Sequence, residues 1–127
     1  VIRGKLSYES GKIKAPIGRH PSHRKKMAVR KNNSKQAVTH FELLEYKDNF
    51  SYLEIELETG RTHQIRVHFS YLGHPVVGDK KYGNNKENLN RLLLHSYQLG
   101  FFHPRSHTWE LFTAPIPEEF HKFMVKR

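Results

Sequence analysis

The spacing of apolar residues changes within residues 51–73, which read SYLEIELETGRTHQIRVHFSYLG. In the first part of this stretch apolar and polar residues alternate, with Leu53, Ile55 and Leu57 on one side. The side chains that point the other way are Tyr52, Glu54, Glu56 and Glu58. A period of two residues is typical of a half-buried β-strand, so we expect the glutamates to form a solvated face.

After Gly60 the period becomes that of a helix. The sequence predicts a helix between Thr62 as the N-cap and Gly73 as the residue after the C-cap, with Pro75 just beyond. The residues on one side of this helix are Ile65, His68, Phe69 and Leu72. Arg66 lies at the edge of that side, where a charge can be partly buried if it pairs with a carboxylate.

The flanking sequence predicts further strands and a second helix. Residues 36–58 form the clearest hairpin, with the turn at 47–49. Residues 92–102 and 108–113 predict a second strand pair, and a terminal helix begins at Pro117. Because strands and helices follow one another without βαβ alternation, we expect an α+β fold with a mixed, largely antiparallel β-sheet and a few flanking helices.

The excess of positive charge is confined to the first third of the chain. The 127 residues carry a formal charge of +10, and residues 1–41 hold 11 Lys and Arg against a single acidic residue. Residues 42–127 hold 11 basic and 11 acidic residues. Such a local positive field suits a polyanion, either nucleic acid or an anionic membrane surface, and a solvated, solubilising surface is the alternative.

Composition excludes several classes of protein. The chain has no cysteine, which excludes disulfides, thiolate catalysis and cysteine-rich zinc sites. No apolar run approaches the roughly 20 residues that cross a bilayer, so we expect no membrane span. The chain carries ten histidines, but the close pairs lack a third ligand, and we expect no metal site.

The densest group of chemically useful side chains lies between Leu57 and His68. Backbone N–H groups at the start of the predicted helix can bind an anion. The amide of Gln64 can pair with the edge of a base, and the guanidinium of Arg61 or Arg66 can bind phosphate or carboxylate through two hydrogen bonds. The alternative is an ordinary amphipathic helix with solvated polar residues.

Several motifs of this sequence together resemble a known family. The run LETGRTHQIRVH at 57–68, then LGHPVVGD at 72–79 and KYG at 81–83, resembles the C-terminal signature of the RluA family of RNA pseudouridine synthases. The segments before and after it, which include PIGRHP at 16–21 and RKKMAV at 24–29, agree in order. The latter two resemble most the RluD type, which modifies large-subunit ribosomal RNA.

The resemblance implies that residues 1–127 are the C-terminal portion of a catalytic domain. Family members carry a catalytic Asp and a tyrosine that stacks on the target base upstream of everything seen here, and neither has a match. Asp48, in a predicted turn, and Asp79, in the GD…YG element, are the only aspartates, and neither is expected to be the nucleophile. The resemblance assigns Arg66 the catalytic role of partner to the absent Asp.

The resemblance also implies the reaction and its substrate. An Asp carboxylate attacks the target uridine, the glycosidic bond breaks, the uracil turns and a carbon–carbon bond replaces it, which requires no cofactor. Arg61, His63 and Gln64 would shape the substrate site. RNA would be bound through the tightest basic cluster, which comprises Arg19, His20, Arg24, Lys25 and Lys26. We expect a cytoplasmic monomer whose partner is large-subunit ribosomal RNA and which binds no membrane.

Two other functions stay open at this point. A non-catalytic RNA-binding module could retain the same scaffold, and a basic adaptor could bind proteins or anionic membranes. The aromatic side chains of Tyr82, Phe101, Phe102 and Trp109 could stack on bases, although core packing is the more frequent fate of aromatic residues on strands.

Overall fold

The two longest strands, β6 (Val38–Lys47) and β7 (Phe50–Leu57), form the hairpin predicted for residues 36–58. Their two-residue turn places Asp48 and Asn49 at φ values of 53° and 68°. A two-residue hairpin turn with positive φ at both positions suits Asp and Asn, which tolerate left-handed backbone better than other side-chain-bearing residues. The hairpin prediction is therefore confirmed.

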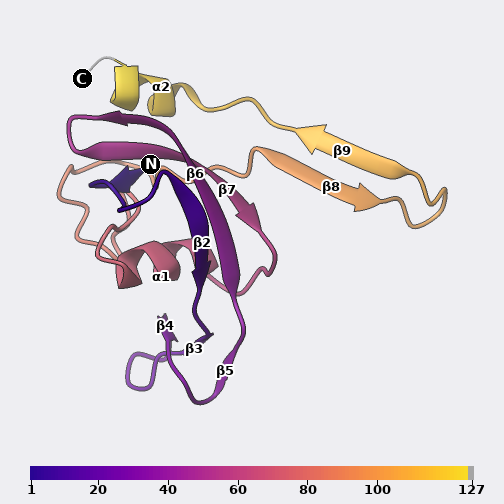
Figure 1. The fold of residues 1–127 in the computed structure, drawn as a ribbon, viewed down its shortest axis with the longest axis horizontal. Coiled ribbons are helices and arrows are strands. Elements are labelled where there is room, and N and C mark those ends of the chain that lie inside the picture. Colours follow the sequence, from indigo (N-terminus) through magenta and orange to yellow (C-terminus); the bar gives the residue numbers. More distant parts are fainter. Residues whose placement is uncertain (126–127) are drawn as a thin grey trace. The chain divides into compact units, whose positions relative to one another are not determined.

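The structure of the protein, a computed structural model, describes residues 1–125 (Figure 1). The chain divides into two compact units, Val1–Leu93 and Leu94–Arg127. In the first unit a four-stranded sheet has the order β1-β7-β6-β2, and a three-stranded sheet has the order β4-β3-β5. The remaining strands of this unit are β1 (Ile2–Arg3), β2 (Ser10–Lys14), β3 (Ile17–Arg19), β4 (Met27–Val29) and β5 (Ser34–Lys35).

Helix α1 (Gln64–Tyr71) follows β7, as the change of period predicts. Its C-terminus is also as predicted: Gly73 has a φ of +83° and donates to the carbonyl of Ser70, and His74 donates to the carbonyl of Phe69. These two hydrogen bonds form a Schellman motif, which requires left-handed backbone at the glycine.

The N-terminus of α1 differs from the prediction. The N-cap is His63, not Thr62, and its side chain makes no capping hydrogen bond. Leu72 was expected on the buried side of the helix, and this expectation is wrong: Leu72 is the C-cap and is 40% exposed. The buried residues of the helix are Gln64, Val67, His68 and Phe69.

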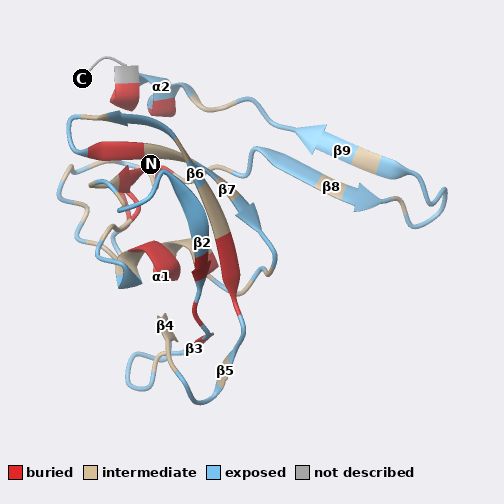
Figure 2. Cartoon of the chain, viewed as in Figure 1, coloured by how far each residue is buried: buried red, intermediate tan, exposed pale blue. Residues whose placement is uncertain are grey.

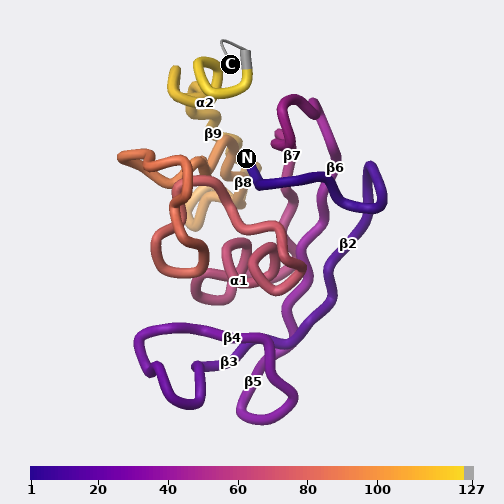
Figure 3. Tube along the Cα trace, turned by 90° about the vertical axis from the view of Figure 1, so that its left-hand side faces the viewer, coloured from indigo at the N-terminus to yellow at the C-terminus, as the bar shows by residue number. Residues whose placement is uncertain are grey.

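Helix α1 packs against both sheets of the first unit, and its buried surface meets theirs (Figures 2 and 3). A core cluster joins Ile17 of β3, Ala37 before β6 and Val67 of α1. Met27 and Tyr82, partly buried, pack against it. The small sheet that carries the basic loop is therefore attached directly to the helix that carries Arg66.

The second unit comprises a hairpin, β8 (Gln98–Phe102) and β9 (Trp109–Thr113), and helix α2 (Glu118–Val125). The strand predicted from residue 92 starts only at Gln98, because Leu93 is buried and donates its N–H to the carbonyl of Val77 in the first unit. All strand pairs among residues 1–125 are antiparallel, and the predicted α+β class is confirmed. Within this range no helix has the length and apolar character needed to cross a bilayer.

Candidate active site

Arg66 of α1 and Asp79 form a two-pronged ion pair. Nε of Arg66 donates to Oδ2 of Asp79 over 3.0 Å, and Nη2 donates to Oδ1 over 2.9 Å. The Asp79 side chain is fully buried, and that of Arg66 is 19% exposed. Parallel N–H···O bonds between a guanidinium and a carboxylate fix the orientation of both groups. Arg66 therefore lies partly buried against a carboxylate, as its place on the helix predicts.

The turn after Val77 holds the Asp79 carboxylate in place. Oδ1 also accepts hydrogen bonds of 3.0 Å from the backbone N–H groups of Lys81 and Tyr82. Burial alone would raise the pKa of Asp79, but the hydrogen bonds from Arg66 and from the two N–H groups outweigh it and hold the pKa below its usual value. Asp79 is therefore an ionised and fixed partner for Arg66.

Gly78 permits the chain to enter this turn. Its φ is +86°, and a Cβ at this position would lie 2.2 Å from the carbonyl oxygen of Arg91. Only glycine fits both the left-handed backbone and the close approach. The sequence signal for this turn was the Gly78–Asp79 pair, but nothing in it indicated that Asp79 would meet Arg66.

Tyr82 connects Arg66 to the rest of the site. Its ring centroid lies 5.1 Å from Cζ of Arg66, within the range of a cation–π contact. The hydroxyl accepts a hydrogen bond of 2.9 Å from the backbone N–H of Met27. Its own proton is thus available for Nδ1 of His63, 2.8 Å away.

His63 sits at the entrance to α1 in an unusual backbone conformation, with a φ of 56°. Burial lowers the pKa of His63, and the positive charges of Arg66 and Lys81 lower it further, against a smaller opposing effect of Asp79. A neutral imidazole agrees with an Nδ1 that accepts the proton of Tyr82. A left-handed non-glycine residue beside an ion pair is typical of a functional site.

Gln64 is buried, at 3% exposure, and its amide is fully used inside the protein. Nε2 donates to the carbonyl of Val38 and to Oγ1 of Thr39, over 3.0 and 2.9 Å. Oε1 accepts from Oγ1 of Thr59 and from the backbone N–H of Arg61, over 2.6 and 3.0 Å. In this structure Gln64 therefore has no amide atom left for the edge of a base, and it holds the β7–α1 turn instead.

The same network continues to His68, which is completely buried. Because Oγ1 of Thr39 accepts from Gln64, its proton goes to Nδ1 of His68, 2.8 Å away. Nε2 of His68 then donates to the carbonyl of Ala15 over 2.9 Å. Burial lowers the pKa of His68, although the hydrogen bond to Ala15 opposes this. His68 is thus a neutral core residue.

The basic cluster lies in the β3–β4 loop. Its five members are Arg19, His20, Arg24, Lys25 and Lys26. The loop is closed by hydrogen bonds from the N–H of His20 to the carbonyl of Lys26, over 2.9 Å, and from Nη1 of Arg19 to the carbonyl of Arg24, over 2.6 Å. Arg19, Arg24 and Lys25 are exposed. The structure thus brings the five residues together in one solvent-facing loop.

A groove of about 540 Å³ separates this small sheet from the β7–α1 turn. Arg19 and Lys35 line it from the sheet side, and Arg61 and Thr62 line it from the turn. Arg61 is fixed there, because its Nε donates to the carbonyl of Gln36 over 3.0 Å. Two residues singled out separately in the sequence, Arg19 and Arg61, therefore face one groove.

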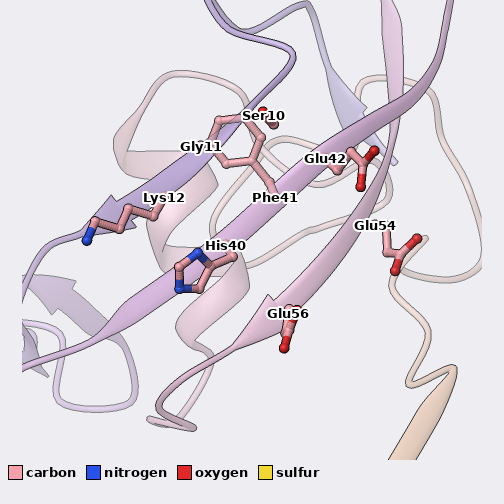
Figure 4. A pocket seen from close by; sticks show the side chains of 8 residues that line it. All are labelled: Ser10, Gly11, Lys12, His40, Phe41, Glu42, Glu54 and Glu56. Carbon is pink, nitrogen blue, oxygen red and sulfur yellow. The ribbon is translucent and has the colours of Figure 1, made fainter.

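A second hollow, of about 420 Å³, lies on the outer face of β2, β6 and β7 (Figure 4). Its polar lining includes Lys12, His40, Glu42, Glu54 and Glu56. The exposed glutamates of β7 confirm the predicted solvated face. Within residues 1–125, no three potential metal ligands of the His, Cys, Asp and Glu types converge here or elsewhere.

The chain matches the family described as RNA pseudouridylate synthase over residues 2–71. It is 48% identical over 120 residues to YlyB of Bacillus subtilis, named an uncharacterized RNA pseudouridine synthase, and 45% identical over 130 residues to ribosomal large subunit pseudouridine synthase D of Neisseria meningitidis. These alignments cover 94% and 92% of this chain but only 39% and 35% of the relatives.

A solved human structure has the same fold. The human RNA pseudouridylate synthase domain containing 1 matches with a TM-score of 0.80 and 31% identity, over 90% of this chain and 51% of the human chain. The chain thus spans about two fifths of the curated relatives and half of the structural one. Since the family match covers more than half of its residues, this chain belongs to the RNA pseudouridylate synthase family.

Proposed function

We propose that residues 1–127 form the C-terminal portion of the catalytic domain of an RNA pseudouridine synthase, which isomerises uridine to pseudouridine within RNA. The observation that carries the proposal is the guanidinium of Arg66. Asp79 holds it through Nε and Nη2, while Nη1 has no hydrogen-bond partner among residues 1–125. We assign Nη1 to the nucleophilic carboxylate, contributed by a part of the protein that this chain does not span.

The aspartates of this chain do not suit the role of nucleophile. Asp79 is buried and accepts four N–H donors, so its oxygens cannot reach a base. Asp48 lies in the β6–β7 turn, outside the group formed by Arg66, Asp79 and Tyr82. The alignments, which leave more than half of each curated relative unmatched, are compatible with a nucleophile elsewhere in the complete protein.

In this proposal Arg66 is a positioning residue that acts through the nucleophile. A carboxylate must be ionised to attack, and a guanidinium within hydrogen-bond distance favours its charged form and lowers its pKa. Asp79 and the Tyr82 ring fix the guanidinium before substrate arrives. His63 and Arg61 border the substrate, and Gln64 supports them by holding the turn on which they lie.

The basic loop and the adjoining groove would bind the RNA backbone. A target base must leave its stack to reach a nucleophile, which costs a few kcal/mol. Contacts from Lys and Arg to phosphates can offset this cost. Arg24 and Lys25 project from the exposed loop, and Arg19 and Arg61 line the groove that leads to the β7–α1 turn.

We further propose that the substrate is large-subunit ribosomal RNA and that the complete protein acts as a monomer in the cytoplasm. The support for the substrate is the name of the Neisseria relative, ribosomal large subunit pseudouridine synthase D.

Tritium release from ribosomal RNA labelled at uridine tests the proposal. The complete protein is expected to release tritium from large-subunit RNA, with small-subunit RNA as the control, and residues 1–127 alone are expected to release none. Binding of RNA without release by the complete protein would indicate a non-catalytic RNA-binding module. Equal or better binding to acidic vesicles than to single-stranded RNA would indicate an adaptor.

A further inference from the structure

The β8–β9 hairpin presents apolar side chains on both of its faces. The register pairs Leu99 with Phe112 and Phe102 with Trp109. Since directly opposite residues point to the same side and neighbours along a strand alternate, these two pairs lie on opposite faces. Leu99, Phe101 and Phe112 share one face, and Phe102, Trp109 and Leu111 share the other.

These side chains contact one another but remain largely exposed. The rings of Phe101 and Phe112 stack at 5.6 Å, and those of Phe102 and Trp109 meet edge to face at 5.1 Å. Leu99 is nevertheless 61% exposed, Phe102 68% and Trp109 57%. Figure 2 shows both strands as exposed over most of their length.

Both edges of the hairpin are also unpaired. The sheet contains β8 and β9 alone among the strands of residues 1–125. A two-stranded hairpin by itself is marginally stable in water, and unpaired edges invite further strands. Strands that are apolar on both faces are characteristic of a sheet covered on both sides.

We propose that β8 and β9 are interior strands of the complete catalytic domain, covered on both faces by the part of the polypeptide that the relatives possess and this chain does not span. This inference rests on the proposed function only in that it takes the chain to be part of a larger domain. The matched structure supports an occupant of sufficient size, because this chain accounts for 51% of it.

Other occupants fit the hairpin less well. A second copy of the chain, docked through a two-fold contact, would cover one face and leave the other in water. RNA that stacks on aromatic rings calls for a positively charged groove around them. Neither strand carries Lys or Arg, and each face includes a leucine, Leu99 on one and Leu111 on the other.

Hydrogen exchange measured by mass spectrometry tests the proposal on the complete protein and on residues 1–127. We expect the amides of 98–102 and 109–113 to exchange at least about 100-fold more slowly in the complete protein, since interior strands open rarely. Trp109, the single tryptophan of the chain, is expected to be readily quenched by iodide in residues 1–127. Rapid exchange of both strands in the complete protein would overturn the proposal.

Substitutions separate burial from general effects. Leu111→Glu is expected to abolish the protection of both strands in the complete protein, while Tyr8→Glu, at a 75% exposed aromatic residue outside the hairpin, is expected to leave it unchanged. Protection of residues 1–127 alone that grows with concentration would indicate a second copy, and protection that requires RNA would indicate a stacking surface; either result would overturn the proposal. Because exchange needs no turnover, an inactive protein with a protected hairpin would contradict the proposed function only.

Discussion

The backbone N–H of Met27 donates a hydrogen bond of 2.9 Å to the hydroxyl of Tyr82. Met27 is the residue that follows the basic loop, and the ring of Tyr82 lies against Arg66. The same hydroxyl contacts His63 at the start of α1. The loop assigned to RNA binding and the ion pair assigned to catalysis are therefore joined through one side chain.

Removing the Tyr82 hydroxyl should weaken this junction. Tyr82→Phe leaves the N–H of Met27 and Nδ1 of His63 without a partner, and a buried polar group left unsatisfied costs about 1–3 kcal/mol. We expect a decrease of this size in the free energy of unfolding measured with urea. The matched control is Tyr46→Phe, since Tyr46 is exposed and its hydroxyl lies 3.4 Å from Asn49. Equal effects of the two changes would contradict the role of Tyr82.

Breaking the Arg66–Asp79 pair should destabilise the protein. Asp79→Asn removes a buried charge and leaves Arg66 unpaired, and removal of one member of a buried ion pair costs about 3–5 kcal/mol. Asp48→Asn is the matched control, because Asp48 is exposed and asparagine tolerates its left-handed backbone. Urea unfolding should show a large decrease in stability for Asp79→Asn and a change within about 0.5 kcal/mol for Asp48→Asn. A small decrease for Asp79→Asn would show that the pair contributes little to stability.

Stability should decline in mild acid because of His68 and, to a smaller extent, His63. The pKa of each is lowered in the folded state, so below about 6.5 the unfolded chain binds more protons than the folded one. The stabilisation is fully present above that pH and is lost as the pH falls through it towards the lower, folded value. The slope can reach about 1.4 kcal/mol per pH unit for each histidine.

Unfolding free energies measured between pH 7.5 and 5 check this prediction. His68→Gln lowers stability throughout but should flatten the pH dependence, because the titrating group is gone. His121→Gln, at an exposed position of α2, should leave the pH dependence as it is in the parent chain. If the His68 variant kept the same slope, the neutral, buried state assigned to His68 would be wrong.

The basic loop should contribute to RNA affinity through charge. Replacing Arg24 and Lys25 by alanine is expected to weaken binding of single-stranded RNA and to reduce the slope of log K against log salt by about 0.7 for each phosphate that the loop no longer neutralises. Lys12→Ala with Lys14→Ala removes the same charge from β2, where both residues are exposed. A similar decrease in affinity for both double variants would indicate a diffuse effect of net charge instead of a site in the loop.

Local patterns predicted the elements that depend on local structure. The β6–β7 hairpin follows from alternation and from an Asp–Asn turn, and the C-terminus of α1 follows from Gly73. The N-terminus of α1 did not follow, because the amide of Gln64, and not the hydroxyl of Thr62, bonds the free N–H of Arg61. Capping preferences describe the usual partner and cannot identify a partner that the tertiary fold supplies.

The candidate site was only half visible in the sequence for a related reason. The position of Arg66 at the edge of the helix face indicated that it needs a carboxylate, but Asp79 reaches it only because of the conformation of the turn at Gly78. Gln64 looks like a surface residue by type, and its burial depends on Val38, Thr39 and Thr59 from other elements. Such contacts depend on tertiary structure that periodicity does not describe.

The most direct measurement is tritium release by the complete protein carrying Arg66→Lys or Arg66→Ala. Lysine keeps the charge but lacks the fork that binds Asp79 and a second carboxylate together. We expect turnover to fall about 100-fold or more in both variants, as for other preorganised charge contacts, with RNA affinity within about twofold of the parent protein. Residual activity should need a higher pH, because the pKa of the nucleophile rises without Arg66. Turnover and a pH profile equal to those of the parent protein, in a folded Arg66→Ala variant, would contradict the role of Arg66.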